Sequence, residues 1–286
     1  LRLLVVAAVG GVCLTAAPVA PPVTELPPPV ELPFKPTAAG GIPTADEFDR
    51  LVRTDPIAAV EAGIRKYQKE VSGFRAVFHK RERIGGKLRD AEVIRVAFRD
   101  EPFAVLMKWE QGGGMADATL YVQGENAGQM QVKLARVGIV KSVDPRSSMS
   151  RMSARYTIEG FGLVQSMKRT HRAWAEAKAG GQLKYEFVGR KAVDELGGRE
   201  CYVLKRVCPA DEIDAYASGE SEEVTDKNRA DSFSTVTLYL DCQTWLQVGT
   251  ELHRADGELA GSYFFRDVEL NPAFDKGTFT AAGLKK

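Results

Sequence analysis

Three histidines are the residues of this sequence best suited to chemistry, because imidazole can act as a general base or a metal ligand near neutral pH. They are His79, His171 and His253, and the residue pattern places them on three different elements. No HExxH or GxSxG motif, phosphate-binding loop or GxGxxG motif accompanies them. We therefore predict no enzyme, with no catalytic residues, no metal site and no cofactor. A hydrolase without a known motif is the weakest alternative.

The cysteines are the other reactive group. Cys13 lies in an apolar N-terminal segment, and Cys201, Cys208 and Cys242 follow much later. No CxxC spacing occurs, which disfavours a zinc site. Cys201 and Cys242 would suit two neighbouring antiparallel strands, so either a disulfide or two buried reduced thiols fit this pair.

Charge separates the candidate partners. Lys and Arg number 39 and Asp and Glu 38, and we find no basic block that would follow a phosphate backbone, so we predict no nucleic-acid partner. Arg75, Arg81 and Arg83 share the polar face of an alternating segment and form a candidate docking surface. The dense run 81–83 predicts a strand that projects beyond its neighbours, and the plain alternative is a solvated strand end.

The N-terminus has the features of an exported protein. Arg2 precedes an apolar stretch from Leu3 to Leu14 and then small residues, which predicts a signal peptide over residues 1–20. Nine of the fourteen prolines lie between Pro18 and Pro43, so residues 21–43 form a proline-rich linker. We expect a single domain over 44–286, located in the periplasm or cell envelope.

The folded region predicts an α+β protein. Helical spacing over 44–71, with a cap at Thr44 and a restart at Pro56, indicates one helix in two pieces. Alternating segments joined by short turns follow, and they predict a meander of antiparallel strands. A second helix is expected over 158–178, ended by Gly180, and strands resume from 183 to 270.

One face of the expected second helix is apolar. Its residues recur at threes and fours, and they are Phe161, Val164, Met167 and Trp174. The plain interpretation is a helix that closes a core. The sharper interpretation is a helix that caps an adaptable apolar pocket, which methionine and aromatic side chains suit.

Several motifs of the chain resemble one bacterial family. They are Arg-Glu-Arg-Ile-Gly-Gly-Lys-Leu at 81–88, Pro-Phe at 102–103 with Lys-Trp at 108–109, Tyr-Val at 121–122, Ile-Glu-Gly-Phe-Gly at 158–162 and Tyr-Phe-Phe-Arg-Asp-Val at 263–268. Through these motifs, the chain from about Ala58 to Phe279 resembles the domain-of-unknown-function family 1571 and, more weakly, the LolA-like lipoprotein carriers.

The resemblance implies a strongly curved antiparallel sheet, an incomplete barrel, with helices that close its concave face. It also implies an apolar cavity there, lined by Met107 and Trp109 from the strands and by the four helix residues Phe161, Val164, Met167 and Trp174. We therefore expect an exported cell-envelope protein, peripheral to the membrane at most, that binds a lipid, an acyl chain or a lipidated partner. The alternative is an envelope protein–protein interaction module without a ligand.

Overall fold

A computed structural model describes residues 41–209 and 230–285. The predicted signal peptide, most of the linker and the polar loop expected at 211–229 lie outside the described residues. Twelve strands form one sheet. They are β1 (Gly73–Ile84), β2 (Lys87–Leu88), β3 (Glu92–Arg99), β4 (Ala104–Gln111), β5 (Ala116–Val122), β6 (Met130–Leu134), β7 (Val140–Val143), β8 (Lys184–Val193), β9 (Arg199–Val207), β10 (Thr235–Asp241), β11 (Gln247–His253) and β12 (Leu259–Leu270).

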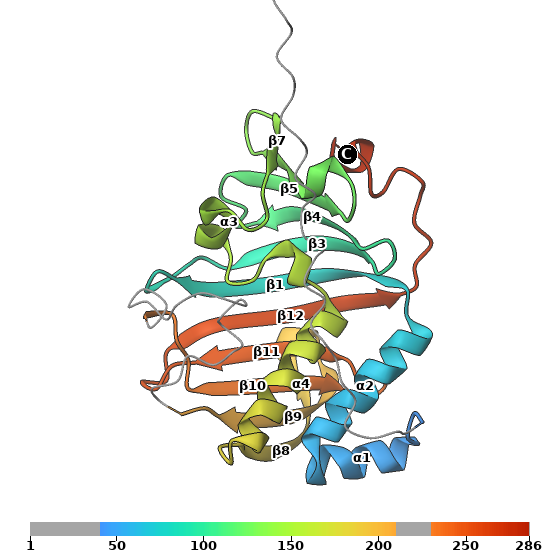
Figure 1. Cartoon of the computed structure of the whole chain (residues 1–286), viewed down its shortest axis with the longest axis vertical. Coiled ribbons are helices and arrows are strands. Elements are labelled where there is room, and N and C mark those ends of the chain that lie inside the picture. The colour runs from blue at the N-terminus through green and yellow to red at the C-terminus, as the bar shows by residue number, and fades with distance from the viewer. Residues whose placement is uncertain (1–40, 210–229, 286) are drawn as a thin grey trace, which may run out of the picture.

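The sheet order is β7-β6-β5-β4-β3-β1-β12-β11-β10-β9-β8, with β2 paired only to β1, and all pairs are antiparallel. Within the described residues β7 and β8 are the two edges, so the sheet is not closed into a barrel (Figure 1). The long pairing of β1 with β12 joins the two halves of the chain. The α+β fold and its antiparallel sheet are thus confirmed.

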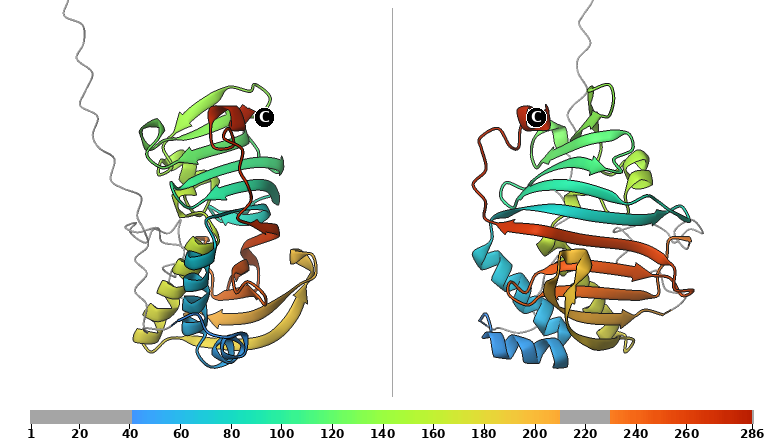
Figure 2. Two further views of the ribbon diagram at one scale, coloured as in Figure 1. Left: turned by 90° about the vertical axis from the view of Figure 1, so that its right-hand side faces the viewer. Right: turned by 180° about the vertical axis from the view of Figure 1, so that it is seen from behind.

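Helices cover one face of the sheet (Figures 1 and 2). They are α1 (Ala45–Thr54), α2 (Pro56–Glu70), α3 (Ser148–Ser153) and α4 (Leu163–Ala179), whereas α6 (Ala281–Lys285) lies at the C-terminal end on the opposite face. The helix in two pieces is confirmed, because Thr44 caps α1 in a reciprocal capping box and Asp55 caps α2 immediately before Pro56. In the described part of the chain, none of the helices has both the length and the apolar character needed to span a bilayer.

The second main helix begins later than its periodicity indicates. Residues 158–160 form a single 3₁₀ turn, and α4 starts only at Leu163. Gly162 explains the break, because its φ of +129° is unsuitable for other residues and a Cβ there would lie 2.9 Å from the Phe98 ring. Phe161 therefore lies in the segment before the helix and not on its apolar face.

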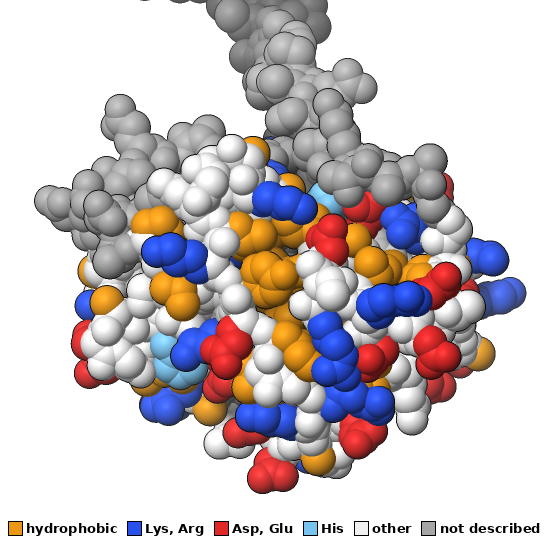
Figure 3. Space-filling view, turned by 90° about the horizontal axis from the view of Figure 1, so that it is seen from below, with side chains coloured by type: hydrophobic (Ala, Val, Ile, Leu, Met, Phe, Trp, Pro, Cys, Tyr) orange, Lys and Arg blue, Asp and Glu red, His pale blue; other side chains and the backbone are white. Residues whose placement is uncertain are grey.

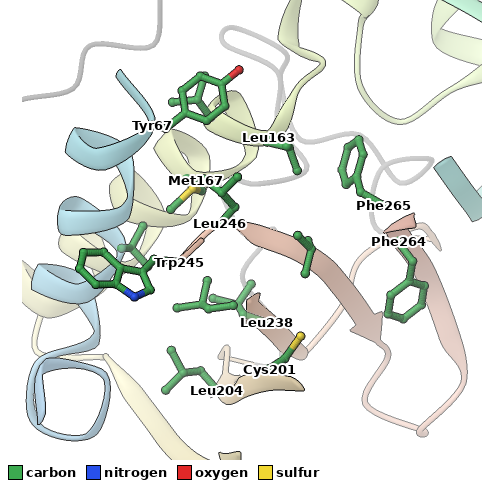
Figure 4. Close-up of a cluster of buried hydrophobic side chains, with 14 of the residues drawn as sticks. Tyr67, Leu163, Met167, Cys201, Leu204, Leu238, Trp245, Leu246, Phe264 and Phe265 are labelled. Atoms are coloured by element: carbon green, nitrogen blue, oxygen red, sulfur yellow. The ribbon is translucent and has the colours of Figure 1, made fainter. Parts of the chain in front are cut away.

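The main core lies between α2, α4 and the sheet. Leu163 and Met167 of α4 are fully buried, and Met167 lies beside Leu246, which follows β10 (Figure 4). Trp245 stacks on Phe48 of α1, with ring centroids 4.2 Å apart. This continuous apolar layer fixes α2 and α4, together with α1, on the sheet.

A smaller core lies on the opposite face of the sheet. Alternation along β4 and β5 turns Leu106 and Leu120 away from the helices. The C-terminal segment after β12 runs back along the sheet (Figure 2) and buries Phe279 and Leu284 against these residues. We did not predict this covering from the sequence, nor did we predict α3 and β7.

Candidate functional site

The concave face is covered in two different ways. Helices α2 and α4 pack together over the part of the sheet near β11. The part formed by β1 and β3–β5 is crossed instead by the strap, our name for residues 144–162, which contains α3 and little other regular structure (Figure 1). A cover of this kind can separate from the sheet at lower cost than a packed helix, because it buries fewer apolar side chains.

Aromatic side chains fill the space beneath the strap. Phe161 of the strap contacts three rings of the sheet, with centroids 5.3 Å from Phe78, 6.3 Å from Phe98 and 5.7 Å from Phe265. Phe103, itself half-buried, continues the group from Phe98 to Tyr121. We call these six residues the aromatic cluster. They form an apolar surface with no charged side chain among them.

Arginines hold the strap in place. Arg146 donates two hydrogen bonds to the Glu159 carboxylate, at 2.9 and 3.2 Å, and Tyr121 donates a long one to the same group at 3.5 Å. Burial raises the pKa of Tyr121 to about 12, and the Glu159 charge adds to this rise. Arg169 of α4 donates to the Gly160 carbonyl and lies over the Tyr156 ring. The strap is thus fixed by polar contacts around the aromatic cluster, whose residues on the sheet form an apolar floor beneath the strap.

Arg155 anchors the middle of the strap to the sheet. Its guanidinium donates to the carbonyls of Arg83, Asp231 and Ala260, at 3.3, 2.9 and 3.3 Å. Its backbone N–H donates to Glu82. The strap is therefore bound to β1, to β12 and to the chain just before β10.

A buried charged cluster borders the apolar floor. Lys80 lies 3.2 Å from Glu82 and 3.0 Å from Glu92, and Tyr263 donates to Glu82 at 2.8 Å. Burial alone would lower the pKa of Lys80, but the two carboxylates outweigh it and raise that pKa. Burial raises the pKa of Tyr263 well above its ordinary value, with Glu82 adding to the effect. Lys80 therefore keeps its positive charge at neutral pH.

This cluster corrects one sequence interpretation. The run 81–83 does not project beyond its neighbours, because Arg81 and Glu82 both pair with β12. Strand alternation turns Glu82 to the concave face, where it is buried, while Arg81 and Arg83 face the other way.

Four of the six predicted cavity residues lie in the main core. They are Met107, Val164, Met167 and Trp174, all buried. Trp109 is half-buried and donates its indole N–H to Glu92 at 2.6 Å, and Phe161 belongs to the aromatic cluster. These side chains fill the space between the helices, the strap and the sheet, so a ligand there has to displace some of them.

The three arginines of the predicted docking surface do not share one site. Six residues of extended strand separate Arg75 from Arg81, which is about 20 Å. Arg75 donates to the Ala273 carbonyl and lies over the Phe274 ring, so it holds the C-terminal segment. Arg83 pairs with Glu258 at 2.7 Å and Arg81 donates to the Arg89 carbonyl, so both stabilise hairpins at the other end of β1.

A hollow of about 290 Å³ lies on the opposite face of the sheet, beside the C-terminal segment. Arg75, Arg95 and Lys108 border it, together with Asp275. Arg95 pairs with Glu110 and Arg75 lies 3.7 Å from Glu269, so much of the positive charge is already balanced.

In the described residues, Cys201, Cys208 and Cys242 form no disulfide. Cys201 pairs across the ladder with Asp241, so Cys242 is one position out of register with it. Burial raises the pKa of the Cys201 thiol to about 12, and the nearby Asp241 adds to the rise. The disulfide between Cys201 and Cys242 is not formed in this structure.

The histidines do not meet. His171 of α4 lies 3.7 Å from the Glu61 carboxylate of α2, and both side chains are buried. This pair lies between packed helices, where it helps to join them, and it has no open position for a substrate. Over residues 41–209 and 230–285, no group of three or more His, Cys, Asp or Glu side chains is placed to hold a metal ion.

The chain belongs to the family described as a protein of unknown function, DUF1571, whose model matches residues 71–283. This confirms the family resemblance found in the sequence motifs. A comparison with curated proteins finds no match.

Three solved structures illustrate the fold to which the chain is similar. One is the lipoprotein LppX of Mycobacterium tuberculosis, 14% identical, with a TM-score of 0.41 over 77% of this chain and 99% of that one. A LolA superfamily protein from Nitrosomonas europaea is 12% identical, with a TM-score of 0.34 over 79% and 99%. A DUF1329 family protein from Desulfovibrio piger is 13% identical, with a TM-score of 0.37 over 81% and 100%.

Proposed function

We propose that this protein is an exported cell-envelope protein that binds an acyl chain, free or as part of a lipid or lipidated partner, between the strap and the concave face. The observation that carries the proposal is the aromatic cluster. Its floor is apolar over several rings, yet its cover is a strap that includes a half-buried Phe161 and is held largely by arginine contacts.

The ligand chemistry follows from this surface. An acyl chain needs apolar contact and no charged partner, and each methylene that it buries contributes about 0.8 kcal/mol. The chain would enter when the strap moves outward, and it would lie between Phe161 and the rings of Phe78 and Phe98 once the strap closes again. The buried cluster of Lys80, Glu82 and Glu92 closes one end of the floor and would exclude the chain from that direction.

The proposal is tested with a fluorescent fatty acid titrated into the protein. We expect saturable binding that is lost in Phe161→Asp, because its carboxylate would stand in the apolar floor. Tyr185→Asp is the matched control, since Tyr185 is an exposed aromatic residue on β8, away from the strap. Equal binding by the two variants, or no binding by the unaltered protein, would refute the proposal. Circular dichroism establishes that both variants are folded.

A further inference from the structure

Apolar side chains are exposed at one end of the sheet. Met115, Val137, Ile139 and Val140 have 77%, 62%, 56% and 37% of their surface exposed. We call these four residues the apolar tip. They come from the β4–β5 turn and the β6–β7 hairpin, which lie side by side because the Ala135 N–H donates to the Met115 carbonyl at 2.9 Å.

The turn that carries the tip is well defined. The Leu134 N–H donates to the Ile139 carbonyl at 2.8 Å, and Arg136 and Gly138 take left-handed backbone angles of +67° and +66°. A tight β6–β7 turn of this kind usually carries polar residues. Here it holds Val137 and Ile139 outward in water, which is unfavourable unless another surface covers them.

The β6–β7 hairpin that carries most of the tip has basic side chains and no acidic ones. Lys133, Arg136 and Lys141 lie in the hairpin, and the sequence has no Asp or Glu from Met130 to Val143. Among neighbouring elements, β5 contributes Asp117, next to the residues that pair with Leu134 and Lys133.

The opposite end of the molecule differs. Seen from below, its surface has acidic and basic side chains interspersed around a short hydrophobic strip (Figure 3). The cationic apolar tip is therefore a local feature and not a general property of the surface.

We propose that the apolar tip docks on an anionic lipid surface, as a membrane-facing contact of the folded domain. Val137, Ile139 and Met115 would enter the headgroup region, and Arg136 and Lys141 would meet the lipid phosphates. A protein partner would offer a different cover, by adding a strand to the edge strand β7. The absence of acids in the hairpin favours the lipid surface. This inference goes beyond acyl-chain binding and does not depend on it.

The test is vesicle flotation. It uses the protein expressed in bacteria from the full sequence. Vesicles of phosphatidylcholine with phosphatidylglycerol should bind it, pure phosphatidylcholine vesicles should bind it less, and salt should weaken the binding. The double variant Val137→Ser, Ile139→Ser should reduce partitioning about tenfold. Arg136→Gln with Lys141→Gln should reduce it roughly fivefold for each charge removed.

The matched control is Val207→Ser, which changes an exposed valine on β9, away from the tip. It should partition like the unaltered protein. The proposal is overturned if the double variant partitions like the control, or if no vesicle binds the protein. It is also overturned if sedimentation shows that the tip instead joins two copies of the chain, which the double variant would separate. None of these readouts uses a fatty acid, so failure here is distinguishable from failure of the acyl-chain proposal.

Discussion

Removal of Arg146 should speed the entry and exit of an acyl chain. Its guanidinium and the Glu159 carboxylate form a two-bond pair, with 39% and 13% of the side chains exposed. A partly exposed pair of this kind contributes about 1 kcal/mol, even though both of its bonds are charge-assisted. In Arg146→Ala that contribution is lost from the closed strap, and the open population rises about fivefold.

Rates, and not affinity, should report the change. The strap closes again over the bound chain, so the free and bound forms lose the same contact. Stopped-flow fluorescence with a fluorescent fatty acid should therefore give association and dissociation rates both about fivefold faster, with Kd nearly unchanged.

Arg53→Ala provides the control. Arg53 makes the same two-bond pair with Asp49 of α1, at 3.0 and 3.2 Å, but lies away from the strap. Arg53→Ala should lower the stability of the fold about as much as Arg146→Ala does, and it should leave both rates unaltered. If Arg146→Ala and Arg53→Ala gave the same rates, the strap would not control access and the reasoning would be wrong.

Four other experiments test the structure. Gly162→Ala should lower Tm by several degrees, whereas Gly181→Ala, at a positive φ with open space around it, should cost less. Lys80→Met should destabilise the fold by about 3 kcal/mol in urea unfolding, since it removes the cation that the buried Glu82 and the half-buried Glu92 share. Burial lowers the pKa of His171, against the opposing effect of Glu61, so the unfolded chain binds the proton more readily. Stability should thus fall as the pH drops from about 6.5 toward the lower pKa that His171 has in the folded protein. In thermal melts, His171→Gln should lose less stability than the unaltered protein over this pH range. Thiol labelling should modify the half-buried Cys242 first and leave Cys201 unreacted until the protein unfolds, and equal rates would contradict the burial pattern.

Local signals accounted for most of the regular elements. A cap at Thr44, a restart at Pro56 and alternation along β1 each depend on residues near in sequence, and the structure bears them out. The family motifs added the curvature and the helix-covered face. The helix was expected from residue 158 because the apolar spacing continues through Phe161, but the positive φ at Gly162 delays the start of α4 to Leu163.

The strap could not be found in this way, because it has no period and its contacts are distant. Arg155 meets Arg83, 72 residues away, and Ala260, 105 residues away. The burial of Glu82 likewise depends on Lys80 beside it and on Tyr263, 181 residues away. The exposed tip had no sequence signal either, since only the structure shows which apolar residues remain uncovered.

Native mass spectrometry of the protein, purified from cells without detergent, tests the central claim most directly. The account predicts a mass excess that organic solvent extracts as an acyl-chain compound, reduced in Phe161→Asp and retained in Tyr185→Asp. A mass that matches the polypeptide alone, together with no uptake of added fatty acid, would contradict it.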